Sequence, residues 1–220
     1  MLVITVSEEV RDIVPAFAGA AVYSRVKNNE SSVGLWEEIT NYISLYKSDN
    51  TLDSIKNNPV VAATRNAYKL FGKDPNRYRP SSEALCRRII RDLPLYRINT
   101  LVDIINLVSI RTGYSIGGFD ADKIAGDVIT LGIGKENEPY ESIGRGILNI
   151  HGLPVYRDAI GGIGTPTSDN ERTKLDLNTT RLLAIFNGYN GKNGLKEATD
   201  MFIKLLHTYA YCEDEKVLYF

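Results

Sequence analysis

The sequence predicts an α+β fold, because helical patterns and strand patterns occupy different parts of the chain. Helical patterns gather between residues 34 and 113, and short apolar stretches separated by turn residues gather between residues 127 and 186. One amphipathic helix and one strand follow them. A length of 220 residues with a hydrophobic content of 43% suffices for one sizeable core. We therefore expect a single domain over residues 1–220.

Strands are predicted where apolar residues alternate, or run for a few positions, between turn signals. These stretches lie at 2–6, 17–26, 127–133, 146–150, 155–157, 180–186 and 216–220. The first two follow each other closely, which predicts that the chain starts with a two-stranded unit.

Helices are predicted where apolar residues recur every three or four positions. These patterns lie at 34–47, 58–72, 81–93, 97–113 and 195–210. Start and stop signals support several of them. Asn58 can cap a helix that has Pro59 at its first position, Ser81 or Ser82 can cap the next helix, and Gly113 can end the fourth.

The distribution of charge limits the possible partners. The net charge of −1 comes from 26 basic and 27 acidic residues, so no global field draws the protein to nucleic acid or to a membrane. Residues 65–97, however, hold nine basic and three acidic residues. A solvated helix face explains such a stripe, and a surface that contacts phosphates is the alternative. The candidate phosphate contacts are Arg87, Arg88, Arg91 and Arg97.

The positions of the cysteines and the hydropathy of the chain argue against several further classes of protein. Cys86 and Cys212 stand far apart, which argues against a disulfide framework and against a thiolate metal site of the usual spacing. We therefore expect a cytoplasmic protein without a metal or a cofactor. The first residues form too short an apolar run for a secretory signal, and no stretch approaches about 18 apolar residues. Membrane association is not expected.

The sequence identifies no catalytic residue. His151 and His207 are its two histidines, and His207 lies among apolar residues of the last predicted helix, where packing is the more common role. No nucleophile elbow, zinc-binding helix motif or cysteine–histidine pairing is visible, which argues against covalent catalysis.

Two segments carry polar groups in informative positions. Asn99, Asp103 and Asn106 follow at i, i+4 and i+7 within an apolar helix, and therefore share one helical face. A glycine turn and an acidic cluster come next. Later, the segment 158–173 is rich in glycine and hydroxyl residues, so its backbone can approach a ligand closely. A plain surface loop is the alternative interpretation.

The motif positions resemble those of a known family. The matching residues are Arg97, Asn99, Val102, Asp103, Ile104, Asn106, Gly113, Phe119, Asp120, Asp122, Lys123 and Ile124. Their spacing resembles the B3/B4 region of the phenylalanyl-tRNA synthetase β subunit, and 159–164 resembles its later glycine loop less closely. The likeness covers about 87–186 and implies a layered β/β/α domain. We expect the core at about 75–215, with an N-terminal α/β segment at 1–74 packed on it.

The resemblance implies a function as well as a fold. In the synthetase this region holds the site that hydrolyses tyrosine wrongly esterified to phenylalanine tRNA. A stand-alone domain of this type is expected to bind tRNA or the 3′ end of an aminoacyl-tRNA, and hydrolysis of mischarged aminoacyl-tRNA in trans is the activity that the family suggests. Such editing needs no protein nucleophile. The chain is too short for a complete tRNA ligase. The alternative is a non-catalytic module that binds RNA, an amino acid or another metabolite.

The chain departs from the family pattern at positions near the expected site. Gly117 replaces a histidine, Ile105 replaces a threonine, and the segment 181–185 lacks a glutamate that would read a tyrosine hydroxyl. We therefore predict that tyrosine is not the preferred amino acid.

The sequence thus yields two sets of site residues. The expected ligand pocket comprises Gly117, Gly118, Gly161, Gly162, Gly164, Thr165, Thr167, Ser168 and Asp169. The family motif is expected to be mainly structural and comprises Asn99, Asp103, Asn106, Phe119, Asp120, Asp122 and Lys123.

Overall fold

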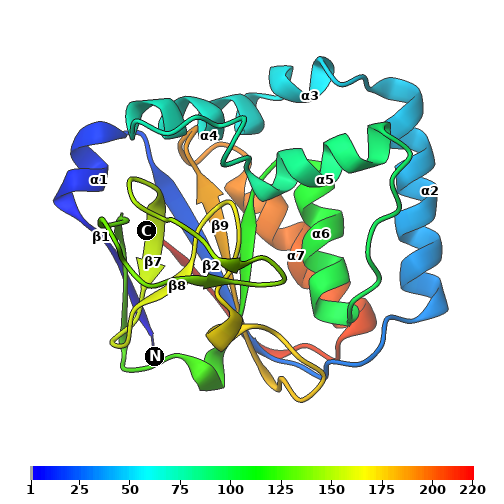
Figure 1. Cartoon of the computed structure of the whole chain (residues 1–220). Helices are drawn as coiled ribbons and strands as arrows, with labels where there is room; N and C mark the ends of the chain where they lie inside the picture. Colours follow the sequence, from blue (N-terminus) through cyan, green and yellow to red (C-terminus); the bar gives the residue numbers. More distant parts are fainter. Residues whose placement is uncertain (1) are drawn as a thin grey trace.

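The structure is a computed structural model that describes residues 2–220. Two four-stranded sheets are stacked face to face, and helices cover the outer face of one of them (Figure 1). The layers are therefore sheet, sheet and helix, which confirms the predicted α+β class. None of the helices in the described residues is long and apolar enough to cross a membrane.

The strands are β1 (Val3–Val6), β2 (Ala18–Arg25), β3 (Ile116–Asp120), β4 (Val128–Ile133), β5 (Glu141–Ser142), β6 (Gly146–Ile147), β7 (Pro154–Arg157), β8 (Gly162–Gly164), β9 (Arg181–Gly188) and β10 (Glu213–Tyr219). The helices are α1 (Glu8–Ile13), α2 (Val33–Asp49), α3 (Ser54–Asn57), α4 (Pro59–Leu70), α5 (Ser81–Ile90), α6 (Thr100–Thr112) and α7 (Leu195–Tyr209). Two 3₁₀ turns, η1 (Ala121–Lys123) and η2 (Glu171–Thr173), complete the set.

The central sheet has the order β10-β2-β9-β3 and is antiparallel throughout. Val22 and Phe186 face α6 and α7, whereas Ala21 and Ile185 face the second sheet. Because both faces of the sheet are buried, residues 182–186 are apolar without alternation.

The second sheet has the order β1-β4-β7-β8, and β1 runs parallel to β4. The predicted two-stranded start is wrong, because β1 and β2 belong to different sheets. The segment between them forms α1, which Ser7 caps by accepting the N–H of Val10. This short helix carries the chain from one sheet to the other.

Most helix ends follow the predicted signals, and one does not. Asn58 caps α4 through the N–H groups of Val60 and Val61, and Gly113 ends α6 with a φ of 83°. The predicted serine cap of α5 is wrong. Its N-cap is Pro80, without a side-chain hydrogen bond.

The expected glycine turn before the acidic cluster is also wrong, because Gly117 and Gly118 lie inside β3. A Cβ atom on Gly118 would lie 2.4 Å from Ile105 Cδ1 and 2.9 Å from Leu175 Cδ1. Gly118 therefore allows close packing of the strand against α6, and Gly117 leaves room for the side chains of Phe119 and Asp169.

Candidate functional site

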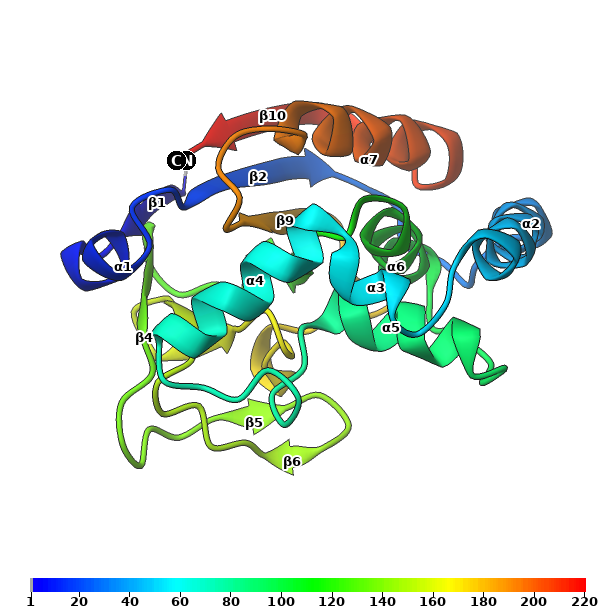
Figure 2. The same ribbon diagram turned by 90° about the horizontal axis from the view of Figure 1, so that it is seen from above.

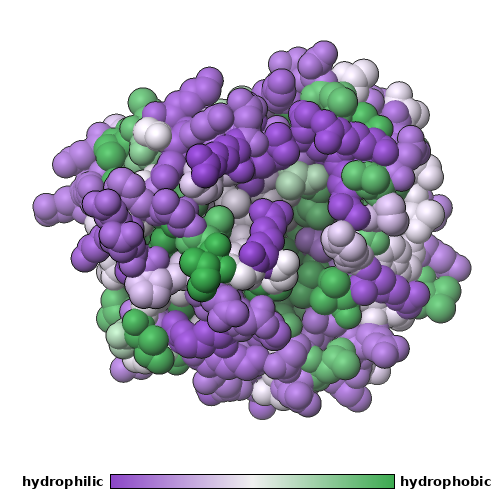
Figure 3. Space-filling view, in the orientation of Figure 1, coloured by the Kyte–Doolittle hydropathy of each residue, from purple (hydrophilic) through white to green (hydrophobic). Residues whose placement is uncertain are grey.

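A cavity of about 470 Å³ lies where α5, α6, β3 and the loop after β8 meet. Its polar lining includes Asn106, Arg145, Ser168, Asp169 and Lys174. Seven aliphatic side chains complete much of the wall: Leu85, Ile98, Val102, Ile105, Ile116, Ile143 and Leu175. In Figure 3 the face in front of α6 is hollowed, and hydrophobic side chains show in the hollow. The cavity can enclose an apolar group and offers a few polar contacts to it.

Hydrogen bonds tie the elements around the cavity together. The N–H of Ser81 at the start of α5 donates to the carbonyl of Pro166 at 2.8 Å. The N–H of Ile143 in the β5–β6 hairpin donates to the carbonyl of Asp169 at 3.1 Å. This hairpin lies at the edge of the molecule opposite α7 and β10 (Figure 2). The loop at 165–169 thus joins a helix and a hairpin that are distant in sequence.

The hydroxyl residues of this loop mainly hold its shape. Thr165 Oγ1 accepts the N–H groups of Thr167 and Ser168 at 3.1 Å each. The Thr167 hydroxyl lies 2.8 Å from that of Tyr68. These local hydrogen bonds fix the loop as a turn, and the turn places Asp169 in the cavity wall.

Asp169 is the acidic group of the cavity. Its Oδ2 accepts the N–H of Gly118 at 2.9 Å, and its Oδ1 makes no hydrogen bond within the described residues. A Cβ on Gly117 or Gly164 would lie about 3 Å from Oδ1, so both glycines leave room for the carboxyl. Burial raises the pKa of Asp169 to about 7. Near neutral pH such a group can both accept and donate a proton.

The residues on the polar face of α6, Asn99, Asp103 and Asn106, have two different roles. Asn99 caps α6 through the N–H of Val102, and Asp103 accepts hydrogen bonds from Ser31 and from Trp36 Nε1. Burial raises the pKa of Asp103, although these hydrogen bonds act in the opposite direction. Asn106 instead lines the cavity, and its amide makes no hydrogen bond within residues 2–220. It is the member of the motif that is free to contact a ligand.

The acidic cluster of the motif is tied to neighbouring segments. Asp120 accepts hydrogen bonds from Thr179 and from the N–H of Asp122. Lys123 pairs with Asp176 at 2.6 Å, and Phe119 is buried in the core between the sheets. These contacts hold η1 against the loop before β9.

A groove of about 380 Å³ adjoins the cavity on the side of α5. The two hollows share Ser81, Leu85, Asn106, Arg145 and Thr167. Five arginines line the groove: Arg79, Arg87, Arg88, Arg91 and Arg145. No acidic residue of the described chain lines it. The groove therefore suits an anionic chain whose end enters the cavity.

Two of these arginines also surround a buried glutamate. Glu83 is fully buried, and its carboxylate lies 2.7 Å from Arg65, 3.5 Å from Arg79 and 3.8 Å from Arg87. The Nε atoms of Arg79 and Arg87 are buried without a hydrogen-bond partner in the described part of the chain. One carboxylate therefore orders three guanidinium groups and leaves them an excess of positive charge.

Comparison with known proteins identifies the family. The family model of the B3/4 domain matches residues 63–210. The chain belongs to the B3/4 domain family. The expected B3/B4 resemblance is thereby confirmed. A comparison with curated proteins finds no match.

The fold of this B3/4 domain is similar to that of an N-terminal fragment of the phenylalanyl-tRNA synthetase β subunit from Pyrococcus horikoshii. The TM-score is 0.51 and the sequence identity is 16%. The similarity covers 98% of this chain and 50% of the fragment, so the chain spans half of the length of that fragment. At this identity the similarity concerns the fold alone.

The B3/4 domain brings only some of the expected pocket residues to the cavity. Gly118, Thr165, Thr167, Ser168 and Asp169 line it. The other expected residues do not: Gly117, Gly161, Gly162 and Gly164 lie outside its lining.

Three of the four arginines expected to contact phosphates lie in the groove, and the fourth does not. Arg87, Arg88 and Arg91 line the groove, and Arg91 is exposed. Arg88 Nε donates to the carbonyl of Pro94. Arg97 lies elsewhere, in a depression beside Trp36.

Sequence reasoning missed Arg145, which lines both hollows of the B3/4 domain. It lies between Gly144 and Gly146 at the turn of the β5–β6 hairpin. An arginine between two glycines is a signal that could have drawn attention to it. Its place beside α5 depends on contacts such as that between the hydroxyls of Ser142 and Ser168, which are 2.7 Å apart.

A further cavity of about 370 Å³ opens between the two sheets of the domain, beside β1 and β10. Its lining includes Tyr23, Asp127, Arg181 and Lys216 among aliphatic residues. None of the expected site residues lines it, and it contacts neither the family motif nor the glycine loop.

Proposed function

We propose that this B3/4 domain binds the 3′ end of an aminoacyl-tRNA and hydrolyses mischarged aminoacyl-tRNA in trans. One observation carries the proposal: a cavity with Asp169 and Asn106 in its wall adjoins a groove lined by five arginines. The family and the similarity to a fragment of a tRNA synthetase subunit support a tRNA-related ligand.

The two hollows suit the two chemical parts of such a ligand. Arginine guanidinium groups bind phosphates through charge-assisted hydrogen bonds, so the groove suits the backbone of a single strand. The cavity then receives the aminoacyl group. Its aliphatic lining favours an apolar amino acid, and no glutamate of the described residues lines it to read a tyrosine hydroxyl. Ile105, which lines the cavity, stands where the family pattern has a threonine, and this supports the same preference.

In this proposal Asp169 accepts the proton of a water molecule. The water oxygen bonds to the ester carbonyl carbon, and the bond between that carbon and the ribose oxygen breaks. Asp169 then returns the proton to the ribose oxygen, so the products are the free amino acid and the uncharged tRNA. In the same proposal the Asn106 amide donates a hydrogen bond to the carbonyl oxygen as negative charge develops on it.

The test is a panel of mischarged tRNAs incubated with the parent protein and with Asp169→Asn at moderate salt. We expect the parent to bind the tRNAs and to release apolar amino acids, and the variant to bind equally well with release slowed by about 10²–10⁴. Binding without faster release in the parent identifies a non-catalytic module. Selective release of tyrosine contradicts the expected preference, and absence of binding to any tRNA overturns the proposal.

A further inference from the structure

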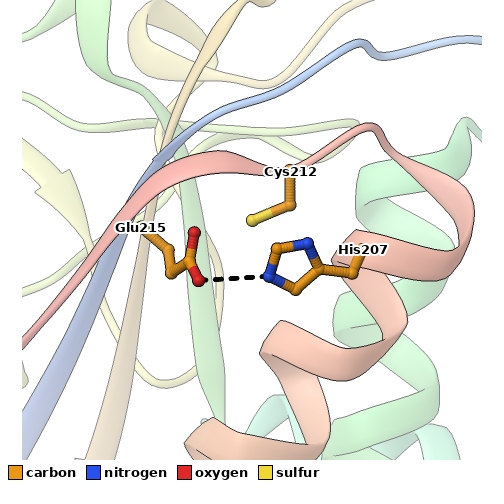
Figure 4. Close-up of side chains that lie close together, drawn as sticks. All are labelled: His207, Cys212 and Glu215. Atoms are coloured by element: carbon orange, nitrogen blue, oxygen red, sulfur yellow. Dashed lines mark hydrogen bonds and ion pairs between the residues drawn. The ribbon is translucent and has the colours of Figure 1, made fainter.

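Three side chains with metal-binding groups meet where α7 passes into β10, outside the cavity and the groove. His207 comes from the last turn of α7, Cys212 from the connection and Glu215 from β10, and all three converge (Figure 4). One ligand atom from each lies within 4.8 Å of the other two, and His207 Nε2 is 3.1 Å from Glu215 Oε1. We propose that these residues form a zinc site.

The donor set fits zinc chemically. Imidazole nitrogen, thiolate sulfur and carboxylate oxygen are its usual ligands, and a site with three protein ligands keeps a fourth position for water. The thiolate and the carboxylate together balance the charge of Zn²⁺.

The geometry needs only a small adjustment. Zinc bond lengths place tetrahedral ligand atoms about 3.3–3.7 Å apart, so the widest separation must shorten by about 1 Å. The side chains of His207 and Glu215 are 48% and 36% exposed, so they are free to rotate inward. The same exposure gives water access to the fourth position.

A contact with β2 holds Cys212 in place. It is buried, and its Sγ lies 3.0 Å from the hydroxyl oxygen of Ser24, a fully buried residue of β2. This hydroxyl donates to the carbonyl of Glu213 at 3.0 Å, and when zinc displaces the thiol proton it can turn to donate to the resulting thiolate, as outer partners of metal ligands do. Tyr211 and Asp214 adopt positive φ angles of 48° and 54° on either side. These are left-handed backbone conformations that residues other than glycine rarely adopt.

Cobalt binding tests the site, because Co²⁺ in a tetrahedral site with a thiolate gives a sulfur-to-metal charge-transfer band and intense d–d bands. We expect the metal-free, untagged protein of residues 1–220 to take up one equivalent of Co²⁺ with these bands, and Zn²⁺ to displace it. His207→Ala and Glu215→Gln should lower Co²⁺ affinity at least about tenfold. Cys212→Ala should remove the charge-transfer band.

The chain offers matched controls in its other histidine and its other cysteine. His151→Ala and Cys86→Ala should leave the spectrum and the affinity unchanged. The exposed positions 207 and 215 tolerate substitution, so the proposal stays testable if Cys212→Ala fails to fold. A spectrum without a thiolate band, or equal affinities in parent and His207→Ala, overturns it. Neither outcome depends on tRNA binding or hydrolysis.

Discussion

Asp169 Oδ2 accepts the backbone N–H of Gly118 at 2.9 Å, across 51 positions of sequence. This hydrogen bond links the loop after β8 to a strand of the central sheet. It also holds a carboxyl group in a cavity wall where burial raises its pKa.

Asp169→Asn should stabilise the protein at neutral and alkaline pH. The pKa of Asp169 rises from its ordinary 3.8 to about 7 on folding, so between these values the folded state binds more protons than the unfolded state. Stability therefore falls as pH rises through this window. Above the window, the ionised carboxylate lowers the stability of the folded state by the full amount. We expect a gain of at most about 4 kcal/mol above pH 7, from about 1.4 kcal/mol for each pH unit of the window, that vanishes near pH 4. Urea unfolding across this range measures it, and lower stability of the variant at high pH contradicts the assignment.

Gly118→Ala should narrow the cavity. The added methyl group would meet Ile105 and Leu175, whose side chains line the cavity and must move. We expect a loss of about 1–3 kcal/mol in stability, together with weaker binding of aminoacyl-tRNA. Gly161→Ala is the matched control, since a methyl group added there would have no atom of the described residues within 4 Å. Equal behaviour of the two variants in thermal melts and tRNA binding would count against this packing.

Removal of Arg88 and Arg91 should reduce the salt dependence of RNA binding. Each phosphate contact to a single strand contributes about 0.7 to the slope of log K against log salt concentration. If both arginines contact phosphates, the double alanine variant should lower the slope by about 1.4. Lys204→Ala on α7, an exposed basic residue outside the groove, is the control. An unchanged slope in the double variant would show that the stripe is a solvated helix face.

Glu83→Gln should be strongly destabilising. The fully buried carboxylate lies among Arg65, Arg79 and Arg87, and its neutral replacement leaves three guanidinium groups without a counter-charge. Breaking a buried ion pair on one side typically costs about 3–5 kcal/mol. Denaturant unfolding measures the loss, and Glu197→Gln on the exposed face of α7 should change little. A loss below about 1 kcal/mol would indicate that water already screens the cluster.

Residues 1–220 should unfold as one domain. Val22 is fully buried in β2, which hydrogen-bonds to β9 and β10 near the other end of the chain. We expect Val22→Ala to lower the stability of the whole chain by about 1–3 kcal/mol. Far- and near-ultraviolet circular dichroism should report one coincident transition. Two separate transitions would assign the segment 1–74 to an independent unit.

The sequence was informative where local rules apply. Helical periodicity and the caps at Asn58 and Gly113 predicted α4 and the end of α6, because these features depend on a few consecutive residues. The same rules failed at Gly117 and Gly118. Two adjacent glycines are typical of a turn, and only their pairing with Ile185 and Ala184 of β9 makes them part of a strand.

By itself, the sequence determined the α+β class and the family motif. Only the tertiary structure decided that Asn106 faces the cavity while Asn99 and Asp103 support the helix, that Arg145 joins the groove, and that Cys212 meets a histidine and a glutamate. The physical reason is that backbone repeats fix the spacing of side chains within one element. Proximity between elements depends instead on how sheets and helices pack, and a single sequence pattern does not encode that directly.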